Sequence, residues 1–225
     1  INMILKAESI SKKYYRPTKN ASHFEAVKAL DFELESGKVT EITGRSGSGK
    51  STLLYMLAGL LKPSSGKVFL DGKDLYSLTD EELSRLRNEK IGVIPQGQTG
   101  LFALTVLENV LAPAAIYGET SLLESRAKEL LEKVGIADLA DAKMTELSGG
   151  EMRRMAIARA LILDPEIIFA DEPTDDLDDE NTKAVLELLQ KTARKGKSVL
   201  LVTHEASAEQ YADKIYRMDA GSLLN

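Results

Sequence analysis

The chain carries Gly44-Arg45-Ser46-Gly47-Ser48-Gly49-Lys50-Ser51 between an expected strand at Lys38–Thr43 and an expected helix over Ser51–Leu61. This stretch fits the pattern G-x-x-x-x-G-K-[ST]: its glycines let the backbone wrap an anion with N–H groups, and the helix N-terminus adds its dipole. In such a loop Lys50 reaches the β and γ phosphates and Ser51 offers its hydroxyl to Mg²⁺. A flexible Gly/Ser turn with a solvated lysine is the alternative.

Short β-rich runs alternate with helical ones along the chain, which is typical of an α/β fold with a mainly parallel sheet. Because residues 98–162 are helical without a convincing strand, we expect a helical subdomain inserted into a core of residues 1–97 and 163–225. The expected strands are Ile4–Ser9, Lys28–Glu35, Lys38–Thr43, Lys67–Leu70, Ile91–Pro95, Ile167–Ala170 and Ser198–Thr203. The expected helices are Ser51–Leu61, Thr79–Asn88, Val106–Tyr117, Ser121–Val134, Gly149–Ile162, Asp179–Arg194 and Ser207–Ala212, followed by a closing hairpin at Lys214–Leu224.

The composition is that of an ordinary globular protein, with 43% hydrophobic and 28% charged residues among 225. There are 29 Lys and Arg against 35 Asp and Glu, and this net charge of −6 gives no broad positive field for a nucleic-acid backbone. The absence of cysteine excludes disulfides, thiolate metal sites and thiol nucleophiles. The longest apolar stretch, Leu53–Leu61, is about half of the ~18 residues that cross a bilayer, and residues 1–6 lack the basic leader of a signal peptide. We therefore expect an intracellular soluble subunit.

Two carboxylates end the apolar run Ile167-Ile168-Phe169-Ala170-Asp171-Glu172. The end of a buried parallel strand faces the ligand crevice of an α/β sheet, so Asp171 can hold Mg²⁺ through water and Glu172 can polarise an attacking water. The alternative is a strand end followed by the acidic start of a helix. His204 directly follows Ser198–Thr203 and is either a structural histidine or a γ-phosphate contact beside the same crevice.

A second anion cradle is expected at Leu147-Ser148-Gly149-Gly150-Glu151. Here a serine and two glycines open a helix and present free N–H groups and a hydroxyl. The alternative is an ordinary helix N-cap. Two phosphate-binding helix starts in one chain are hard to explain by one self-contained site.

Six elements occur in a characteristic order: GRSGSGKST at 44–52, Gln96, LSGGE at 147–151, IIFADEPT at 167–174, Leu177-Asp178 and His204. This order resembles the nucleotide-binding subunit of ABC transporters over nearly the whole chain, and LSGG separates that family from other phosphate-loop proteins. The resemblance implies a phosphate-loop NTPase core with a mainly parallel sheet, an antiparallel N-terminal β portion and an inserted helical subdomain. It also implies an ATPase that forms a head-to-tail homodimer around two ATP, each lying between the phosphate loop of one subunit and Ser148, Gly149 and Gly150 of the other.

The same resemblance assigns nucleotide contacts. Tyr14 matches the aromatic residue that stacks on adenine, with Tyr15 as a competitor. Asp178 matches the loop that crosses the dimer interface. The phosphate-loop residues that match are Gly44, Arg45, Ser46, Gly47, Ser48, Gly49, Lys50, Ser51 and Thr52.

The implied reaction is phosphoryl transfer from ATP to water, carried by positioning and electrostatics. Glu172 matches the general base and His204 the residue that contacts the γ-phosphate; together with Lys50 and Gln96 they form the expected catalytic set. Gln96 matches a residue that contacts both Mg²⁺ and the attacking water. The expected metal-binding residues are Ser51, Gln96 and Asp171.

The segments 71–75, 86–92, 104–110 and 178–182 look like the branch of lipoprotein release, macrolide export and antimicrobial-peptide resistance. This branch implies integral membrane permease subunits encoded separately, a peripheral place at the cytoplasmic face of the membrane, export or transmission of force, and no nucleic-acid partner. We expect a groove near Gln96–Tyr117 to receive a helix of the membrane partner through Phe102, Leu104 and Val106, unless these side chains pack inside the helical subdomain. The rival is a soluble ABC ATPase of DNA repair or of the ribosome, although the chain has neither a long coiled-coil insertion nor a second cassette.

Three positions depart from the family pattern. Asp175-Asp176 stands where small or neutral residues are usual, so carboxylates crowd a region that must close near ATP. This predicts a stronger dependence on Mg²⁺ and on basic partners across the interface, or weaker spontaneous dimerisation; a solvated acidic loop is the alternative. Glu41 lies mid-strand, which requires either a cation partner or a strand less buried than expected. Gly97-Gln98-Thr99-Gly100 follows Gln96 and predicts a looser coupling of that glutamine.

Overall fold

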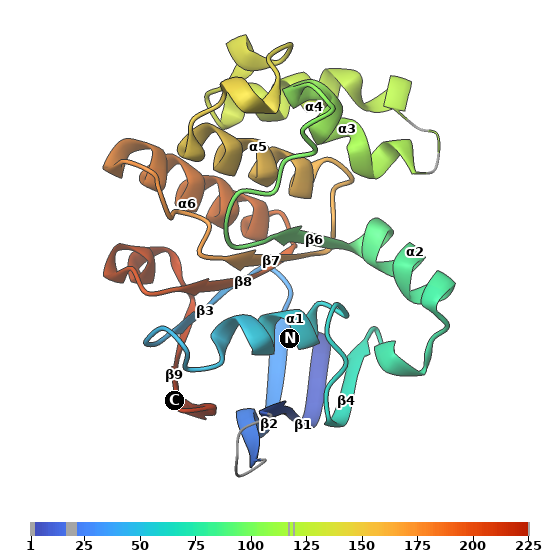
Figure 1. The fold of residues 1–225 in the computed structure, drawn as a ribbon, viewed down its shortest axis with the longest axis vertical. Helices are drawn as coiled ribbons and strands as arrows, with labels where there is room; N and C mark the ends of the chain where they lie inside the picture. Colours follow the sequence, from blue (N-terminus) through green and yellow to red (C-terminus); the bar gives the residue numbers. More distant parts are fainter. Residues whose placement is uncertain (1–2, 17–21, 117, 119, 225) are drawn as a thin grey trace.

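The computed structural model describes residues 3–16, 22–116, 118 and 120–224 (Figure 1). Its strands are β1 (Met3–Arg16), β2 (Ser22–Glu35), β3 (Val39–Thr43), β4 (Ser65–Leu70), β5 (Lys73–Asp74), β6 (Ile91–Ile94), β7 (Ile167–Asp171), β8 (Ser198–Thr203), β9 (Lys214–Asp219) and β10 (Ser222–Leu224). Its α-helices are α1 (Lys50–Leu57), α2 (Asp80–Lys90), α3 (Val106–Ala115), α4 (Thr120–Lys133), α5 (Gly149–Leu161) and α6 (Asp179–Arg194). Short 3₁₀ helices lie at Leu75–Ser77, Ala137–Leu139, Met144–Glu146 and Ala206–Tyr211.

Two sheets form the β structure. The larger has the order β10-β9-β3-β8-β7-β6, in which β9, β3, β8, β7 and β6 are parallel and β10 pairs antiparallel with β9. The smaller has the order β2-β1-β4-β5 and is antiparallel throughout. The expected α/β class, with a mainly parallel sheet and an antiparallel N-terminal portion, is confirmed.

The parallel sheet is buried on both faces, which explains its near-continuous apolar strands. Along β7, Ile167 and Phe169 pack with Leu53 of α1 in one core cluster, between the two sheets. Ile168 and Ala170 point the other way, into a second cluster with α3 to α6. Figure 1 shows α1 between the sheets and α5 and α6 on the opposite side of β7 and β8. Because β3, β7 and β8 are parallel, their carboxyl ends lie at the same edge of the sheet, where the loop after β3 leads into α1.

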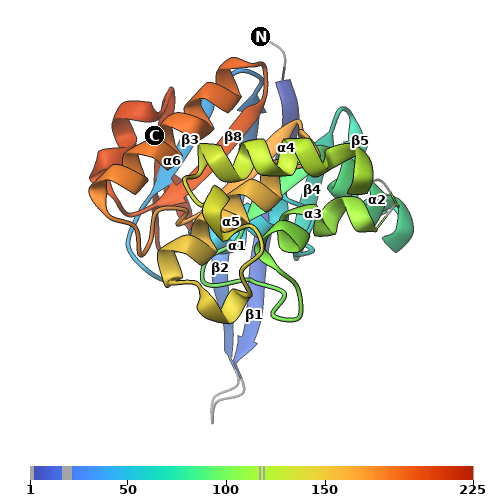
Figure 2. The ribbon, with the colours of Figure 1, turned by 90° about the horizontal axis from the view of Figure 1, so that it is seen from above.

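Helices α3, α4 and α5 pack against one another (Figure 2), and α5 also contacts the edge strand β6. Val106, Leu131 and Met155 are among their buried contacts. Arg126 of α4 donates to the carbonyl oxygen of Ile162 at 2.8 Å and so ties the group to the segment that leads into β7. We propose that this group is the inserted helical subdomain of residues 98–162. Among the described residues, no helix is both long enough and apolar enough to cross a membrane.

Several expected elements have different bounds. The first strand continues beyond Ser9 because it pairs along its length with β2, whose start also precedes Lys28. The helix expected to reach Leu61 ends at Leu57, and Gly59 then turns with a φ of 70°. The helix expected at Ser207–Ala212 is a 3₁₀ helix shifted by one residue, and the short strand β5 was not expected. The predicted end of α3 at Tyr117 lies outside the described residues.

Candidate functional site

The loop between β3 and α1 requires glycine at two close approaches of the backbone. A Cβ atom on Gly44 would lie 2.3 Å from the carbonyl oxygen of Met218, and one on Gly49 would lie 2.3 Å from that of Ala26. Gly49 also has a φ of 106°, a conformation that residues with a side chain rarely adopt. The absence of a Cβ atom at both positions therefore lets this loop lie against the backbone of Met218 and Ala26.

Lys50 lies over the loop rather than in solvent. Its side chain is buried, and its Nζ donates to the carbonyl oxygens of Gly44 at 2.8 Å and Arg45 at 3.3 Å. Within the described residues it forms no ion pair, and the nearby Ser48 hydroxyl is buried without a hydrogen-bond partner. An ammonium group and an unpartnered hydroxyl on one loop fit an anion that accepts several hydrogen bonds.

Ser51, at the start of α1, contacts the end of β7. Its hydroxyl donates to Asp171 Oδ1 at 3.0 Å. Asp171 is buried, its Oδ2 has no hydrogen-bond partner in the described part of the chain, and burial raises its pKa. A hydroxyl and a carboxylate with a free oxygen are hard oxygen ligands, which Mg²⁺ prefers, so these residues fit that ion.

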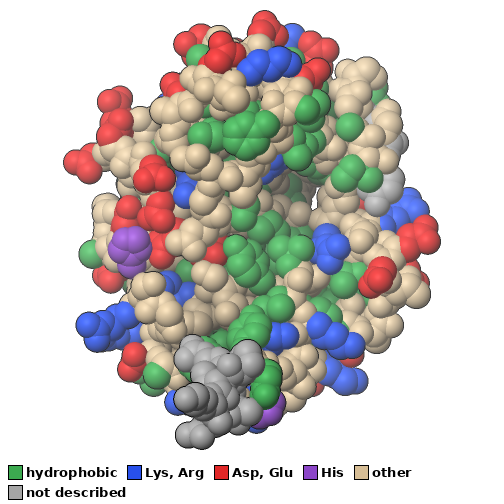
Figure 3. All heavy atoms as spheres, in the orientation of Figure 1, with side chains coloured by type: hydrophobic (Ala, Val, Ile, Leu, Met, Phe, Trp, Pro, Cys, Tyr) green, Lys and Arg blue, Asp and Glu red, His purple; other side chains and the backbone are tan. Residues whose placement is uncertain are grey.

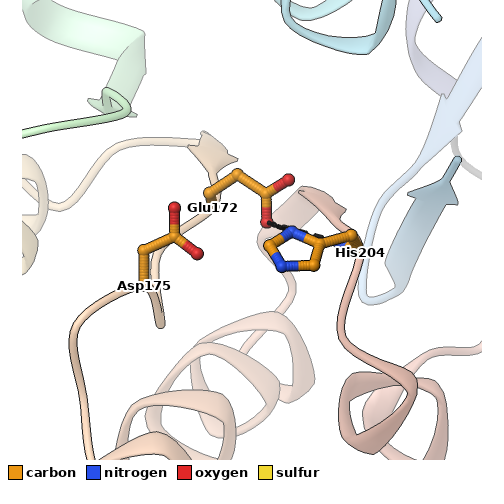
Figure 4. Close-up of side chains that lie close together, drawn as sticks. All are labelled: Glu172, Asp175 and His204. Atoms are coloured by element: carbon orange, nitrogen blue, oxygen red, sulfur yellow. Dashed lines mark hydrogen bonds and ion pairs between the residues drawn. The ribbon is translucent and has the colours of Figure 1, made fainter. Parts of the chain in front are cut away.

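Glu172, the next residue, lies beside His204 and Asp175 (Figure 4). Its backbone N–H donates to Val202 at 2.8 Å and its φ is 47°, in the left-handed region that costs a non-glycine residue about 1–2 kcal/mol. Its Oε2 accepts from the backbone N–H of His204 at 3.3 Å and lies 3.0 Å from the Nδ1 of that residue. The hydrogen bond that the His204 side chain donates to Glu172 raises the pKa of His204, and burial raises the pKa of Asp175.

A pocket of about 610 Å³ joins these groups, and we call it the loop pocket. The structure brings most of the predicted residues to it from five separate parts of the chain. It is lined by Tyr14, Phe24, Ala26, Arg45, Ser46, Gly47, Gly49, Lys50, Ser51, Thr52, Gln96, Glu172 and His204. Gly44, Ser48 and Asp171 support it from the loop and the strand end without lining it.

Tyr14 and Tyr15 lie on opposite faces of β1, because successive side chains on a strand point to opposite faces. Tyr14 lines the loop pocket, whereas the Tyr15 ring packs edge-on against His23 with centroids 5.7 Å apart. Phe24, which pairs with Tyr14 across β1 and β2, also lines the pocket and was missed by the sequence reasoning. Only the register of the β1–β2 pair shows that Phe24 lies opposite Tyr14.

A separate hollow of about 460 Å³ surrounds the LSGGE segment, and we call it the LSGGE hollow. Ser148 caps α5 by accepting from the N–H of Glu151 at 3.3 Å, and Asp178 caps α6 by accepting from that of Asn181 at 2.8 Å. The residues around the hollow are Gln98, Ser148, Gly149, Gly150, Arg154, Asp176, Leu177, Asp178 and Asn181. None of them lines the loop pocket, so within one chain the structure does not bring the two anion cradles together.

At two of the three positions that depart from the family pattern, Glu41 and the segment after Gln96, the structure differs from what the sequence predicted. Glu41 is 0% exposed, neither of its carboxylate oxygens has a hydrogen-bond partner among the residues that the structure describes, and burial followed by the charge of Glu209 raises its pKa to about 7. Both explanations offered for Glu41 are therefore wrong. The chain is held to α5 on both sides of Gln96, because Arg159 donates to the Thr99 hydroxyl after it and Arg153 to the Pro95 carbonyl oxygen before it, each at 2.9 Å. This tethering argues against a loose coupling.

A third cavity, of about 420 Å³, forms a groove between α2 and the end of α3. Leu60, Arg87, Pro113 and Ile116 are among its lining residues. The groove lies where a docking surface was expected, but Phe102, Leu104 and Val106 do not line it. Val106 is fully buried as the first residue of α3, so its predicted role in docking is wrong.

The fold and these sites define a phosphate-loop cassette, and residues 27–175 match the family model described as ABC transporter. The chain belongs to the ABC transporter family. It is similar to the lipoprotein-releasing system ATP-binding protein LolD of Leptospira interrogans, with 44% identity over 83% of this chain and 79% of that protein. It is also similar to LolD of Aquifex aeolicus, with 41% identity over 98% of this chain and 96% of that protein. These likenesses place it in the branch expected from its sequence.

Solved structures of ABC transporter cassettes are also similar to this chain. The dimeric post-hydrolysis state of the ATP-binding cassette MJ0796, bound to ADP and Pi, matches with a TM-score of 0.88 and 33% sequence identity. The match covers 97% of this chain and 95% of that one.

Proposed function

We propose that the chain binds ATP with Mg²⁺ and hydrolyses it as the ATP-binding subunit of an ABC transporter. The observation that carries this proposal is the contact between Ser51 and Asp171, because it joins an anion-binding loop to a buried carboxylate with a free oxygen. The names of the similar proteins, ATP-binding subunits of lipoprotein-releasing systems, support the same function. The rival of a soluble ATPase without a membrane partner is not favoured by these relatives.

Binding begins at the phosphates. Lys50 and the N–H groups of residues 44–52 hold the phosphate oxygens, and Tyr14 stacks on adenine at the other end of the loop pocket. Ser51, Asp171 and Gln96 are the residues that hold Mg²⁺. When bound, that ion neutralises charge on the β and γ phosphates. Phe24, beside Tyr14, adds apolar surface for the base.

Hydrolysis transfers the γ-phosphoryl group to water. The carboxylate of Glu172 takes a proton from the attacking water, whose oxygen bonds to the γ-phosphorus while the bond to the bridging oxygen of ADP breaks. His204 contacts the γ-phosphate, and its hydrogen bond to Glu172 keeps both side chains at the same end of the pocket. The products are ADP and inorganic phosphate.

A head-to-tail homodimer explains why the loop pocket and the LSGGE hollow lie apart in one chain. In that dimer Ser148, Gly149 and Gly150 of one subunit cover the phosphates held by the other. Asp178 lies at the rim of the LSGGE hollow and crosses to the partner. Each ATP then binds both subunits, so nucleotide state controls whether the dimer is closed or open.

The dimer drives separate integral membrane subunits from the cytoplasmic face of the membrane, in export or in the transmission of force. The groove between α2 and α3 is the place for a helix of such a subunit, because Leu60 and Ile116 leave apolar surface exposed along it. The lining also includes Arg87, which offers a charged contact at the rim. No nucleic-acid partner is part of this function.

Replacing the proposed base tests the reaction directly. Glu172→Gln keeps the shape of the side chain but cannot accept the proton, so ATP binding is retained and turnover falls by about 10²–10⁴-fold. Size-exclusion chromatography with light scattering then shows an ATP-dependent dimer. Glu166→Gln, at a carboxylate outside the loop pocket, is the control and behaves as the wild type. Turnover by Glu172→Gln at the wild-type rate excludes Glu172 as the base.

A further inference from the structure

Glu172, Asp175 and His204 converge at one edge of the loop pocket although they come from the end of β7, the loop after it and the end of β8 (Figure 4). One ligand atom from each lies within 4.8 Å of the other two. In Figure 3 a histidine lies among acidic side chains on the left of the face shown, at a place otherwise rich in Asp and Glu. Asp175 has no role in the hydrolysis described above.

The negative charges of Glu172 and Asp175 are only partly offset by positively charged side chains. Among the described residues, no lysine or arginine forms an ion pair with Glu172 or Asp175, and the only side-chain partner of Glu172 is the imidazole of His204. Glu172 is 6% exposed, so water screens its carboxylate poorly. Arg153 acts on Asp175 only at longer range, and Asp176 adds a further negative charge. Among the described residues, the imidazole of His204 is therefore the only group close to both carboxylates that can offset their charge.

We infer that Glu172, Asp175 and His204 form a site for a divalent transition metal ion, with Zn²⁺ as the best fit. An imidazole with two carboxylates suits Zn²⁺ and disfavours Mg²⁺ and Ca²⁺, which prefer ligand sets of oxygen alone. The 3.0 Å between Glu172 Oε2 and His204 Nδ1 is close to the ~3.3 Å that separates neighbouring ligands around a tetrahedral zinc ion. The half-exposed Asp175 supplies the third ligand by a small rotation, and water supplies the fourth.

Occupancy of this site inhibits hydrolysis, because zinc takes the lone pairs of Glu172 and the ring nitrogen of His204 that the reaction needs. The inhibition of hydrolysis rests on the proposed function, whereas zinc binding itself does not. This site is distinct from the Mg²⁺ residues Ser51 and Asp171, which lie on the α1 side of the strand end. Asp175 completes the zinc site, since a neutral residue at position 175 would leave only Glu172 and His204 as ligands.

Zinc binding is measured on the nucleotide-free, tag-free chain by competition with a chromophoric zinc indicator in chelator-free buffer. The chain suits this measurement because it has no cysteine and only two histidines. One tight site is expected on the wild type, weakened at least about tenfold by Asp175→Asn and by His204→Ala, since loss of a ligand costs no less than loss of its supporting hydrogen bond. Asp176→Asn and His23→Ala are the matched controls and bind as the wild type does. Equal binding by Asp175→Asn, or loss of binding in His23→Ala, overturns the site.

A zinc-edge X-ray absorption spectrum of the loaded chain gives an independent readout, with one imidazole nitrogen and otherwise oxygen ligands expected. A spectrum with two or more imidazoles contradicts the site, because only one histidine lies there. In a parallel ATPase assay, added Zn²⁺ inhibits the wild type at lower concentration than Asp175→Asn. If the wild type hydrolyses no ATP without zinc, the proposed function fails while the binding result stands by itself.

Discussion

The Ser51 hydroxyl donates a 3.0 Å hydrogen bond to Asp171 Oδ1 across 120 positions of sequence, and so joins the start of α1 to the end of β7. The parallel sheet makes this contact, because β3 and β7 lie on either side of β8 and end at the same edge. In the proposed function, Ser51 and Asp171 would act as one unit toward a cation bound with the phosphates.

Asp171→Asn keeps the size of that side chain and removes its charge. We expect the affinity for ATP with Mg²⁺ to fall tenfold or more, which is about 1.4 kcal/mol, while the affinity for ATP in EDTA stays near that of the wild type. Isothermal titration with and without Mg²⁺ measures the difference. The role assigned to Asp171 is wrong if the variant gains as much affinity from Mg²⁺ as the wild type does.

Glu41 makes the stability of the protein depend on pH. Its folded-state pKa of about 7 lies above the ordinary 4.5, so its protonated form stabilises the fold below about pH 4.5 and this contribution is lost as the pH rises through 7. The loss amounts to about 3 kcal/mol. Glu41→Leu is expected to raise the free energy of unfolding at pH 8 and to flatten its decrease between pH 5 and 8, as followed by urea denaturation.

The control for that experiment is Glu209→Gln, which removes only the weaker cause of the shift and leaves Glu41 buried. Its effect is expected to be smaller than that of Glu41→Leu. A Glu41→Leu protein that is less stable than the wild type at pH 8 contradicts the account, because it means that the carboxylate has a favourable partner.

Tyr14 and Tyr15 differ in the face of β1 that they occupy, and their substitution separates the two roles. Tyr14→Ala is expected to weaken ATP binding by about 1–3 kcal/mol, the contribution of one base stacked on an aromatic ring. Tyr15→Ala is expected to change it less than about twofold, since that ring packs against His23. The affinities for ATP and for inorganic triphosphate are compared, and Tyr14→Ala should lower only the affinity for ATP. An equal loss in both variants excludes Tyr14 as the stacking residue.

The groove between α2 and α3 is expected to hold the membrane subunits. Ile116 is 69% exposed and lines the groove, so Ile116→Asp should release the chain from co-expressed permease subunits in detergent. Leu122→Asp changes a residue that is 81% exposed but lies outside the groove, and should leave the complex intact. Both variants should still bind ATP, which shows that they fold. Retention of the complex by Ile116→Asp places the docking surface elsewhere.

The sequence predicted best those features that depend on neighbours along the chain. The loop at 44–51 lies between β3 and α1, and Asp171 and Glu172 lie at the end of β7, as the sequence predicted, because a strand, a turn and a helix start are local. The part played by Phe24 was not predictable, because it depends on the register between β1 and β2. For Val106 the sequence left a docking surface and the subdomain core open, because an apolar residue at a helix start suits both, and the packing places it in the core.

The head-to-tail arrangement is the central claim, and cross-linking between chains tests it most directly, since the chain has no cysteine of its own. Ser46 is exposed in the loop pocket and Ser148 in the LSGGE hollow, so Ser46→Cys and Ser148→Cys are made in separate Glu172→Gln chains and mixed. With ATP and a short bifunctional thiol reagent, mass spectrometry is expected to find position 46 of one chain joined to position 148 of the other, and little cross-linking without ATP. Joining of 46 to 46 or of 148 to 148, or no effect of ATP, would contradict the arrangement.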